Sequence, residues 1–146
     1  MRQIAVGLTL LFCVALLGCA SEERNPLEGS WRIAAGHQKT ADTAFSYTEG
    51  NPSTIKMFAG NQVGWFGRWA FGGGDTMTYY GWGTYVLEGS NYTESIKDHS
   101  VKLQIGKAIP LELEIRNDTL IQKGPRKIGE YADGKWEMYE VWVRLK

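Results

Sequence analysis

One residue that could do chemistry is Glu94, a carboxylate in the segment Tyr92-Thr93-Glu94-Ser95-Ile96-Lys97. In a β-strand every second side chain shares a face, so Tyr92, Glu94 and Ile96 point the same way. The two bulky neighbours predict that this face is buried and carries Glu94 inward. A buried carboxylate must be paired, hydrogen-bonded or protonated, because burying it bare is costly. Two roles remain open: a polar anchor in a ligand pocket, or an interior hydrogen-bond cluster with Tyr92 or an arginine.

Aromatic residues form the second candidate group, with 6 tryptophans and 7 tyrosines in the chain. Trp65, Trp69 and Trp82 lie among glycines, which leave the faces of their rings uncovered by neighbouring side chains. Exposed ring faces of this kind can stack on a sugar or line an apolar cavity. The alternative is that these rings simply fill the core of a small barrel.

Catalytic and metal-binding patterns are missing from the sequence. His37 and His99 are the only histidines, they lie far apart, and no cysteine pair completes a zinc spacing. No Ser-His-Asp arrangement and no nucleophile elbow is present. The glycine-rich segment 71–75 lacks the Lys-Ser/Thr pair of a phosphate-binding loop and is predicted to be a mobile hairpin tip. We therefore expect no enzyme activity, no metal and no cofactor.

The elements that would position these residues show the two-residue alternation of β-strands. Alternation is clearest in Leu111–Arg116 and Val101–Ile105, and Asn117-Asp118 forms a turn into Thr119–Gln122. Residues 37–52 show no period and are predicted to form a loop or lid over one barrel end. Further strands are predicted at residues 29–35, 54–59, 62–69, 83–88, 92–97 and 136–145. Eight or nine short strands at hairpin spacing predict an all-β, antiparallel up-and-down barrel, because such a meander must close or cover its edges.

Charge and length limit the class of protein. The 146 residues carry 16 basic and 16 acidic side chains, which argues against a nucleic-acid binder and fits one domain. Arg2 precedes an uncharged run, Ile4–Leu17, that is shorter than the roughly 17–25 residues of a membrane-spanning helix. A basic start, a short apolar run and a small-residue exit are typical of a secretory signal peptide.

The exit of that run, Leu16-Leu17-Gly18-Cys19, resembles the lipobox of bacterial lipoproteins. The resemblance implies a signal peptide at residues 1–18, a lipidated Cys19 with a tether to residue 26, and a domain at residues 27–146. Lipid such as palmitate on Cys19 would then hold the protein firmly to the membrane, since two or more acyl chains make attachment stable. The residue after the cysteine is Ala20 and not aspartate, which resembles the signal for sorting to the outer membrane. The resemblance therefore implies a location in the bacterial cell envelope. The alternative is an ordinary secretory signal that happens to end in cysteine.

Four segments resemble uncharacterised lipocalin-like lipoproteins of the Bacteroidetes: Leu27-Glu28-Gly29-Ser30-Trp31, 55–61, 83–94 and Trp142-Val143-Arg144. The first of them resembles the Gly-x-Trp opening of lipocalin-like barrels. The resemblance implies a lipocalin-like barrel in which Arg144 covers Trp31 and closes one end. A guanidinium over an indole face contributes about 0.5–2 kcal/mol. The alternative places Arg144 at a solvated strand end.

Together these patterns predict an outer-membrane-anchored barrel that binds a small apolar or amphiphilic ligand without catalysis. One alternative is an envelope accessory lipoprotein with a filled barrel that acts through protein contacts, and another is a surface glycan-binding module. The interior volume separates them, because a small-molecule site needs a cavity of about 300 Å³ or more. The sequence specifies neither the ligand nor the oligomeric state. The candidate ligand-binding residues are Tyr92, Glu94, Trp65, Trp69 and Trp82.

Overall fold

The computed structural model describes residues 25–48, 50–70 and 74–146, and all strands within these residues belong to one antiparallel sheet. The strands are β1 Gly29–Lys39, β2 Ala44–Thr48, β3 Ser53–Ala59, β4 Gln62–Ala70, β5 Thr76–Glu88, β6 Asn91–His99, β7 Ala108–Arg116, β8 Thr119–Gly124 and β9 Glu137–Arg144. Two short 3-10 turns, η1 Lys102–Gln104 and η2 Gly129–Tyr131, lie in the connections. Within the residues described, no helix is long and apolar enough to cross a bilayer.

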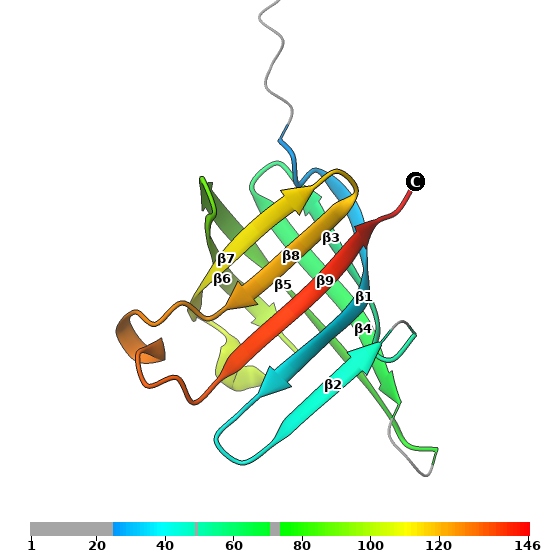
Figure 1. Cartoon of the computed structure of the whole chain (residues 1–146), viewed down its shortest axis with the longest axis vertical. Coiled ribbons are helices and arrows are strands. Elements are labelled where there is room, and N and C mark those ends of the chain that lie inside the picture. The colour runs from blue at the N-terminus through cyan, green and yellow to red at the C-terminus, as the bar shows by residue number, and fades with distance from the viewer. Residues whose placement is uncertain (1–24, 49, 71–73) are drawn as a thin grey trace, which may run out of the picture.

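The sheet closes because β1 pairs with β9 as well as with β3. Each barrel strand pairs with the next one along the chain, apart from β2, and Figure 1 shows β9 lying beside β1 to complete the ring. The predicted fold class is therefore confirmed: the protein is an all-β, antiparallel up-and-down barrel. β2 is an additional ninth strand on the edge of β1.

Short turns with glycine or asparagine connect the strands, as the sequence predicts. Gly60 and Gly89 have φ angles of 59° and 61°, and Asn117 has a φ of 54°. These left-handed conformations are accessible to glycine and asparagine at little cost. The predicted glycine-rich tip includes residues 71–73, which lie outside the described residues. The strands on either side of it pair as a hairpin, with Ala70 opposite Thr76.

The prediction of a loop or lid over residues 37–52 is wrong. β1 continues to Lys39, and Phe45 and Tyr47 turn inward from β2. The first half of β1 pairs with β3 and the second half with β2, so β2 extends the same wall. The Ser- and Thr-rich composition of this segment gives no strand pattern in the sequence. The strand forms because it pairs with β1 and because Tyr47 is buried.

The prediction of a strand at Val101–Ile105 is also wrong. This segment contains η1, and its apolar side chains are exposed, Leu103 most of all. Alternation reflects strand structure only when one face is buried, and here neither face is. The segment instead folds back over the end of the barrel, where the Gly106 amide donates to the Ile96 carbonyl.

One end of the barrel is filled. The Trp31 indole donates to the Leu27 carbonyl at 2.8 Å, and the Arg144 guanidinium lies 4.1 Å from the centroid of the Trp31 ring. Arg144 also donates to the carbonyls of Glu28 and Pro26, at 2.5 and 2.7 Å. The structure thus brings together Trp31 and Arg144, the pair that the resemblance singled out. The Arg144 side chain thus closes the end of the barrel at which the described chain begins, by stacking on Trp31 and by binding backbone carbonyls.

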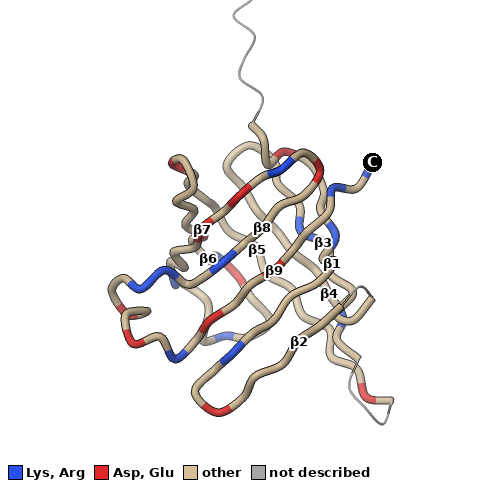
Figure 2. The backbone as a smooth tube through the Cα atoms, viewed as in Figure 1, with Lys and Arg blue, Asp and Glu red and all other residues tan. Residues whose placement is uncertain are grey.

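Charged residues are spread over the barrel. Figure 2 shows basic and acidic positions interspersed along strands and connections, with no extended face of one sign in that view. Residues 1–24, which include Cys19 and most of the predicted tether, lie outside the described residues.

Candidate functional site

The other end of the barrel holds a cavity of about 320 Å³. The residues that line it come from every strand and from the connections that precede β7 and β9. Met77 and Val101 belong to the lining and are 46% and 48% exposed, so the cavity reaches the protein surface there. Its volume lies at the lower end of the range of about 300–1,000 Å³ that is typical of small-molecule sites.

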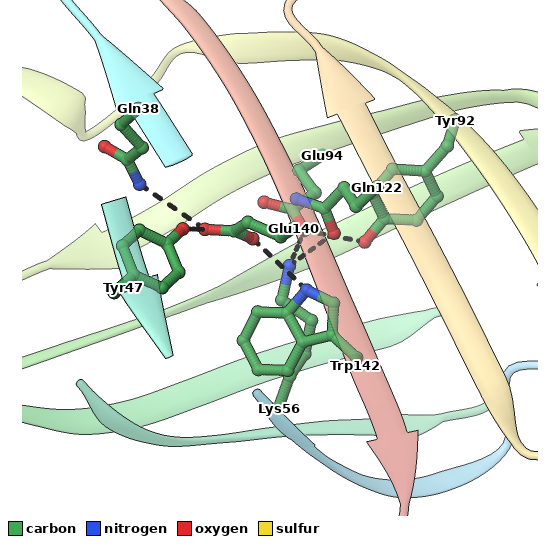
Figure 3. A network of polar contacts seen from close by, with 8 residues as sticks. All are labelled: Gln38, Tyr47, Lys56, Tyr92, Glu94, Gln122, Glu140 and Trp142. Carbon is green, nitrogen blue, oxygen red and sulfur yellow. Dashed lines mark hydrogen bonds and ion pairs between the residues drawn. The ribbon is translucent and has the colours of Figure 1, made fainter. Parts of the chain in front are cut away.

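A buried polar cluster forms the floor of the cavity. The Lys56 ammonium lies 2.9 Å from Glu94 Oε1 and 2.9 Å from Gln122 Oε1 (Figure 3). The Tyr92 hydroxyl donates to the same Glu94 oxygen at 2.8 Å. Burial, and secondly the Glu94 charge, raises the pKa of Tyr92, so this hydroxyl remains a donor at neutral pH. The ion pair is therefore enclosed and hydrogen-bonded, which offsets the cost of desolvating it.

Strand alternation explains why these polar groups face inward. In β3, Thr54, Lys56 and Phe58 are the buried positions, and exposed or half-buried residues separate them. In β6 the buried positions include Tyr92 and Glu94. The inward-facing rows of these strands therefore mix one or two polar side chains with apolar ones.

Glu140 is a second buried carboxylate in the lining, only 8% exposed. Its Oε1 accepts hydrogen bonds from the Tyr47 hydroxyl at 2.7 Å and from Gln38 Nε2 at 3.4 Å. Its Oε2 accepts from Trp142 Nε1 at 3.2 Å. Burial, and secondly the Glu140 charge, raises the pKa of Tyr47 far above its usual range. Three neutral donors thus surround this carboxylate (Figure 3).

The walls above the polar floor are aromatic. Trp69 contacts Phe45 and Tyr47 edge to face, with ring centroids 5.1 and 5.4 Å apart. Trp65 and Trp142 lie on the cavity side with the Lys56 ammonium 5.6 and 5.1 Å from their ring centroids. Aromatic walls and a polar floor give the cavity the character of a site for an amphiphilic molecule.

A β-bulge turns His99 into the cavity. Trp82 pairs with Asp98 whereas Gly83 pairs with Ile96, so β6 contains one extra residue at this point. The extra residue reverses the alternation, and His99 faces inward opposite Gly81. Burial lowers the pKa of His99, which keeps the imidazole neutral at neutral pH.

The other histidine of the chain lies away from the cavity. His37 is exposed and stacks on Tyr139, with the ring centroids 5.5 Å apart. Across the described parts of the chain, no group of three or more His, Cys, Asp or Glu side chains is arranged to hold a metal ion.

The structure brings only some of the predicted ligand-binding residues together. Glu94, Trp65 and Trp69 line the cavity. Tyr92 is completely buried beneath the floor, where it supports Glu94 but does not reach the cavity. Trp82 is 48% exposed on the outer surface, because strand alternation turns its neighbours Gly81 and Gly83 inward in its place.

Sequence reasoning missed Lys56, Gln122, Glu140 and Tyr47. Glu140 carries the same signal that identified Glu94: it lies between Met138 and Trp142 at two-residue spacing. Lys56 lies likewise between Thr54 and Phe58. Tyr47 was missed because it lies in β2, which the sequence analysis predicted to be part of a loop.

Comparison with solved structures finds a lipocalin-like protein from Bacteroides uniformis ATCC 8492, determined by crystallography. The two chains share 14% sequence identity, and the match covers 83% of this chain and 100% of the other, with a TM-score of 0.46. No protein-family model matches the sequence, and no curated protein matches it either.

Proposed function

We propose that the protein binds a small amphiphilic molecule in the barrel cavity, without converting it chemically. The observation that carries this proposal is the cavity of about 320 Å³, which has aromatic walls, a buried polar floor and a rim that reaches the surface. The apolar part of a ligand would displace water from the walls. Its polar part would meet the Lys56–Glu94–Gln122 floor or Glu140, whose side chains are already held in place by hydrogen bonds.

The same cavity argues against the alternative of a filled barrel. Phe58, Tyr85 and Tyr92 contact one another and fill the end near Trp31. None of these rings lines the cavity. A glycan-binding surface built from Trp65, Trp69 and Trp82 is less well supported, because Trp82 is on the outer face while the other two are inside.

The proposal extends to the cell envelope, where the lipobox-like segment ending in Cys19 would anchor the barrel to the outer membrane. The described chain begins at the closed end, where Asn25 donates to the Gly60 carbonyl at 3.1 Å. β1 then runs from this end to Gln38 at the cavity (Figure 1). A tether before Asn25 would therefore leave the cavity opening directed away from the anchor.

Titration of the purified protein with fatty acids, retinoids, haem and short glycans tests the binding function. Trp65 and Trp69 lie in the cavity, so a bound amphiphile is expected to change tryptophan emission in a saturable way. Trp65→Phe should reduce the signal, and Trp82→Phe on the outer face should leave it intact. Saturation by short glycans alone would favour the glycan-binding alternative, and no saturation by these classes or by any other amphiphile, cationic ones included, would contradict the proposal.

A further inference from the structure

The charges that line the cavity do not balance. Lys56, Glu94 and Glu140 are its ionisable lining groups besides Tyr79 and the neutral His99. Lys56 pairs with Glu94, whereas Glu140 forms no salt bridge with any residue that the structure describes. Burial raises the pKa of Tyr79, so this residue adds no charge at neutral pH. With all three charged groups ionised, the interior carries one uncompensated negative charge.

Glu140 has room for a further interaction. An ionised carboxylate has about four acceptor positions, and three donors reach this one. The Gln38 contact, at 3.4 Å, is the longest of the three. All three donors are neutral, so they solvate the charge of Glu140 without cancelling it. A cation that entered the cavity would cancel that charge beside a carboxylate that is only 8% exposed, where the attraction is stronger than in bulk water.

The walls favour a cation as well. The faces of tryptophan rings attract ammonium groups within about 6 Å of the ring centroid. The Lys56 ammonium already occupies such positions against Trp65 and Trp142. Trp69 and Phe45 also line the cavity, and Trp69 pairs with Met77, which is exposed at the opening. The cavity wall therefore already holds one cation of the protein's own against tryptophan rings.

With the proposed binding function as its basis, we propose that the ligand is an organic monocation: a primary or quaternary ammonium group on a short apolar body. Glu140 would neutralise the ammonium group, and the tryptophan walls would hold the apolar body. A ligand carboxylate would instead add a second uncompensated negative charge, since Glu94 and Gln122 already engage the Lys56 ammonium.

Four probes with one chain length separate the head groups: octyltrimethylammonium, octylammonium, 1-octanol and octanoate. Calorimetric titration of the purified full-length protein is expected to give a Kd at least tenfold lower for the two cations than for 1-octanol. Octanoate is expected to bind most weakly. Equal affinity for 1-octanol and the cations, or tightest binding of octanoate, would overturn the cation assignment while the binding function stands.

The remaining outcome separates the two proposals. If none of the four octyl probes saturates while a member of the wider amphiphile panel does, only the cation assignment is overturned. If neither set saturates, the binding function fails too. The probe comparison uses the unaltered protein, so it remains decisive even if a variant of Glu140 does not fold.

Glu140→Gln tests the residue itself. The amide keeps the shape of the side chain and removes its charge, so cation affinity should fall about tenfold. Affinity for 1-octanol should stay within about twofold, and this unchanged binding also reports a folded cavity. Glu112→Gln, on the exposed outer face of β7, is the matched control and should change neither affinity. Cation affinity that is the same in Glu140→Gln and Glu112→Gln would overturn the role of Glu140.

Discussion

The Lys56 ammonium lies 2.9 Å from the Glu94 carboxylate and thereby connects β3 and β6, two strands that are not neighbours in the sheet. Both side chains are almost fully buried, at 5% and 6% side-chain exposure. A contact of this kind crosses the barrel interior, so it links opposite walls as well as forming the cavity floor. Its loss should affect both stability and binding.

Glu94→Gln is expected to destabilise the protein by about 3 kcal/mol, because it leaves the buried Lys56 ammonium without the carboxylate that pairs with it directly. Urea unfolding measures this free energy. The double variant Lys56→Met, Glu94→Gln should lose much less than the sum of the single variants, since the two residues interact directly.

Glu112→Gln is the control for that cycle. Glu112 pairs with Lys123 at 3.8 Å on the exposed surface, and such pairs contribute about 0–1 kcal/mol. A cost of Glu94→Gln no larger than that of Glu112→Gln would show that the buried pair does not stabilise the fold.

Strand alternation allowed Glu94 to be placed inside the barrel from sequence alone. The rule works there because Tyr92 and Ile96 mark the buried face without ambiguity. Of the two partners expected for Glu94, Tyr92 does donate to it, but the charged partner is Lys56 and not an arginine. Lys56 could not be named from the sequence, because it meets Glu94 across the interior and no adjacent-strand register brings the two together. Interior contacts of a barrel depend on its closure and diameter, which local periodicity does not encode.

The two incorrect segment predictions have a common physical origin. Val101–Ile105 alternates without a buried face, whereas β2 is buried through Phe45 and Tyr47 without a long alternating pattern. Periodicity reports burial only in strands that are long and paired on a covered face. The position of His99 was unpredictable for a further reason, since a single bulged residue reverses the inward and outward sides.

Arg144→Ala is expected to destabilise the closed end by about 2 kcal/mol, through loss of the stacking on Trp31 and of two hydrogen bonds to backbone carbonyls. Trp31→Ala should cost about 3–5 kcal/mol because the indole is completely buried. The double variant should lose less than the sum in denaturant unfolding.

Lys146→Ala is the matched control for Arg144→Ala. Both side chains interact with Asp118, but Lys146 is 84% exposed and should contribute less than about 0.5 kcal/mol. Strict additivity of Trp31→Ala and Arg144→Ala would mean that the stacked contact does not stabilise this end of the barrel.

Cys19→Ala is expected to abolish lipid attachment and to leave uncleaved precursor or protein released from the membrane. Cell fractionation and intact-protein mass spectrometry measure the two outcomes. Cys13→Ala is the matched control, because Cys13 lies within the apolar run and is predicted to be removed with it. Should Cys19→Ala sediment with membranes as the parent does, the lipobox interpretation fails.

Gly81→Ala is expected to disturb the cavity wall from within the strand. A Cβ atom at Gly81 would overlap the Trp65 indole and lie 3.0 Å from the His99 ring, so both rings must move. Because Trp65 lines the cavity, ligand affinity should fall by about tenfold, which is 1.4 kcal/mol, and the emission spectrum of the free protein should shift.

Gly64→Ala is the matched control, because it also replaces a glycine within a strand by alanine but does not crowd the cavity wall. A Cβ atom at Gly64 would come no closer than 3.7 Å to any neighbouring atom, which is an ordinary van der Waals contact. This variant should therefore keep the emission spectrum and the ligand affinity of the parent. If Gly81→Ala also keeps both, the Trp65 ring is not held against Gly81, and the aromatic wall does not contribute to binding in the way proposed.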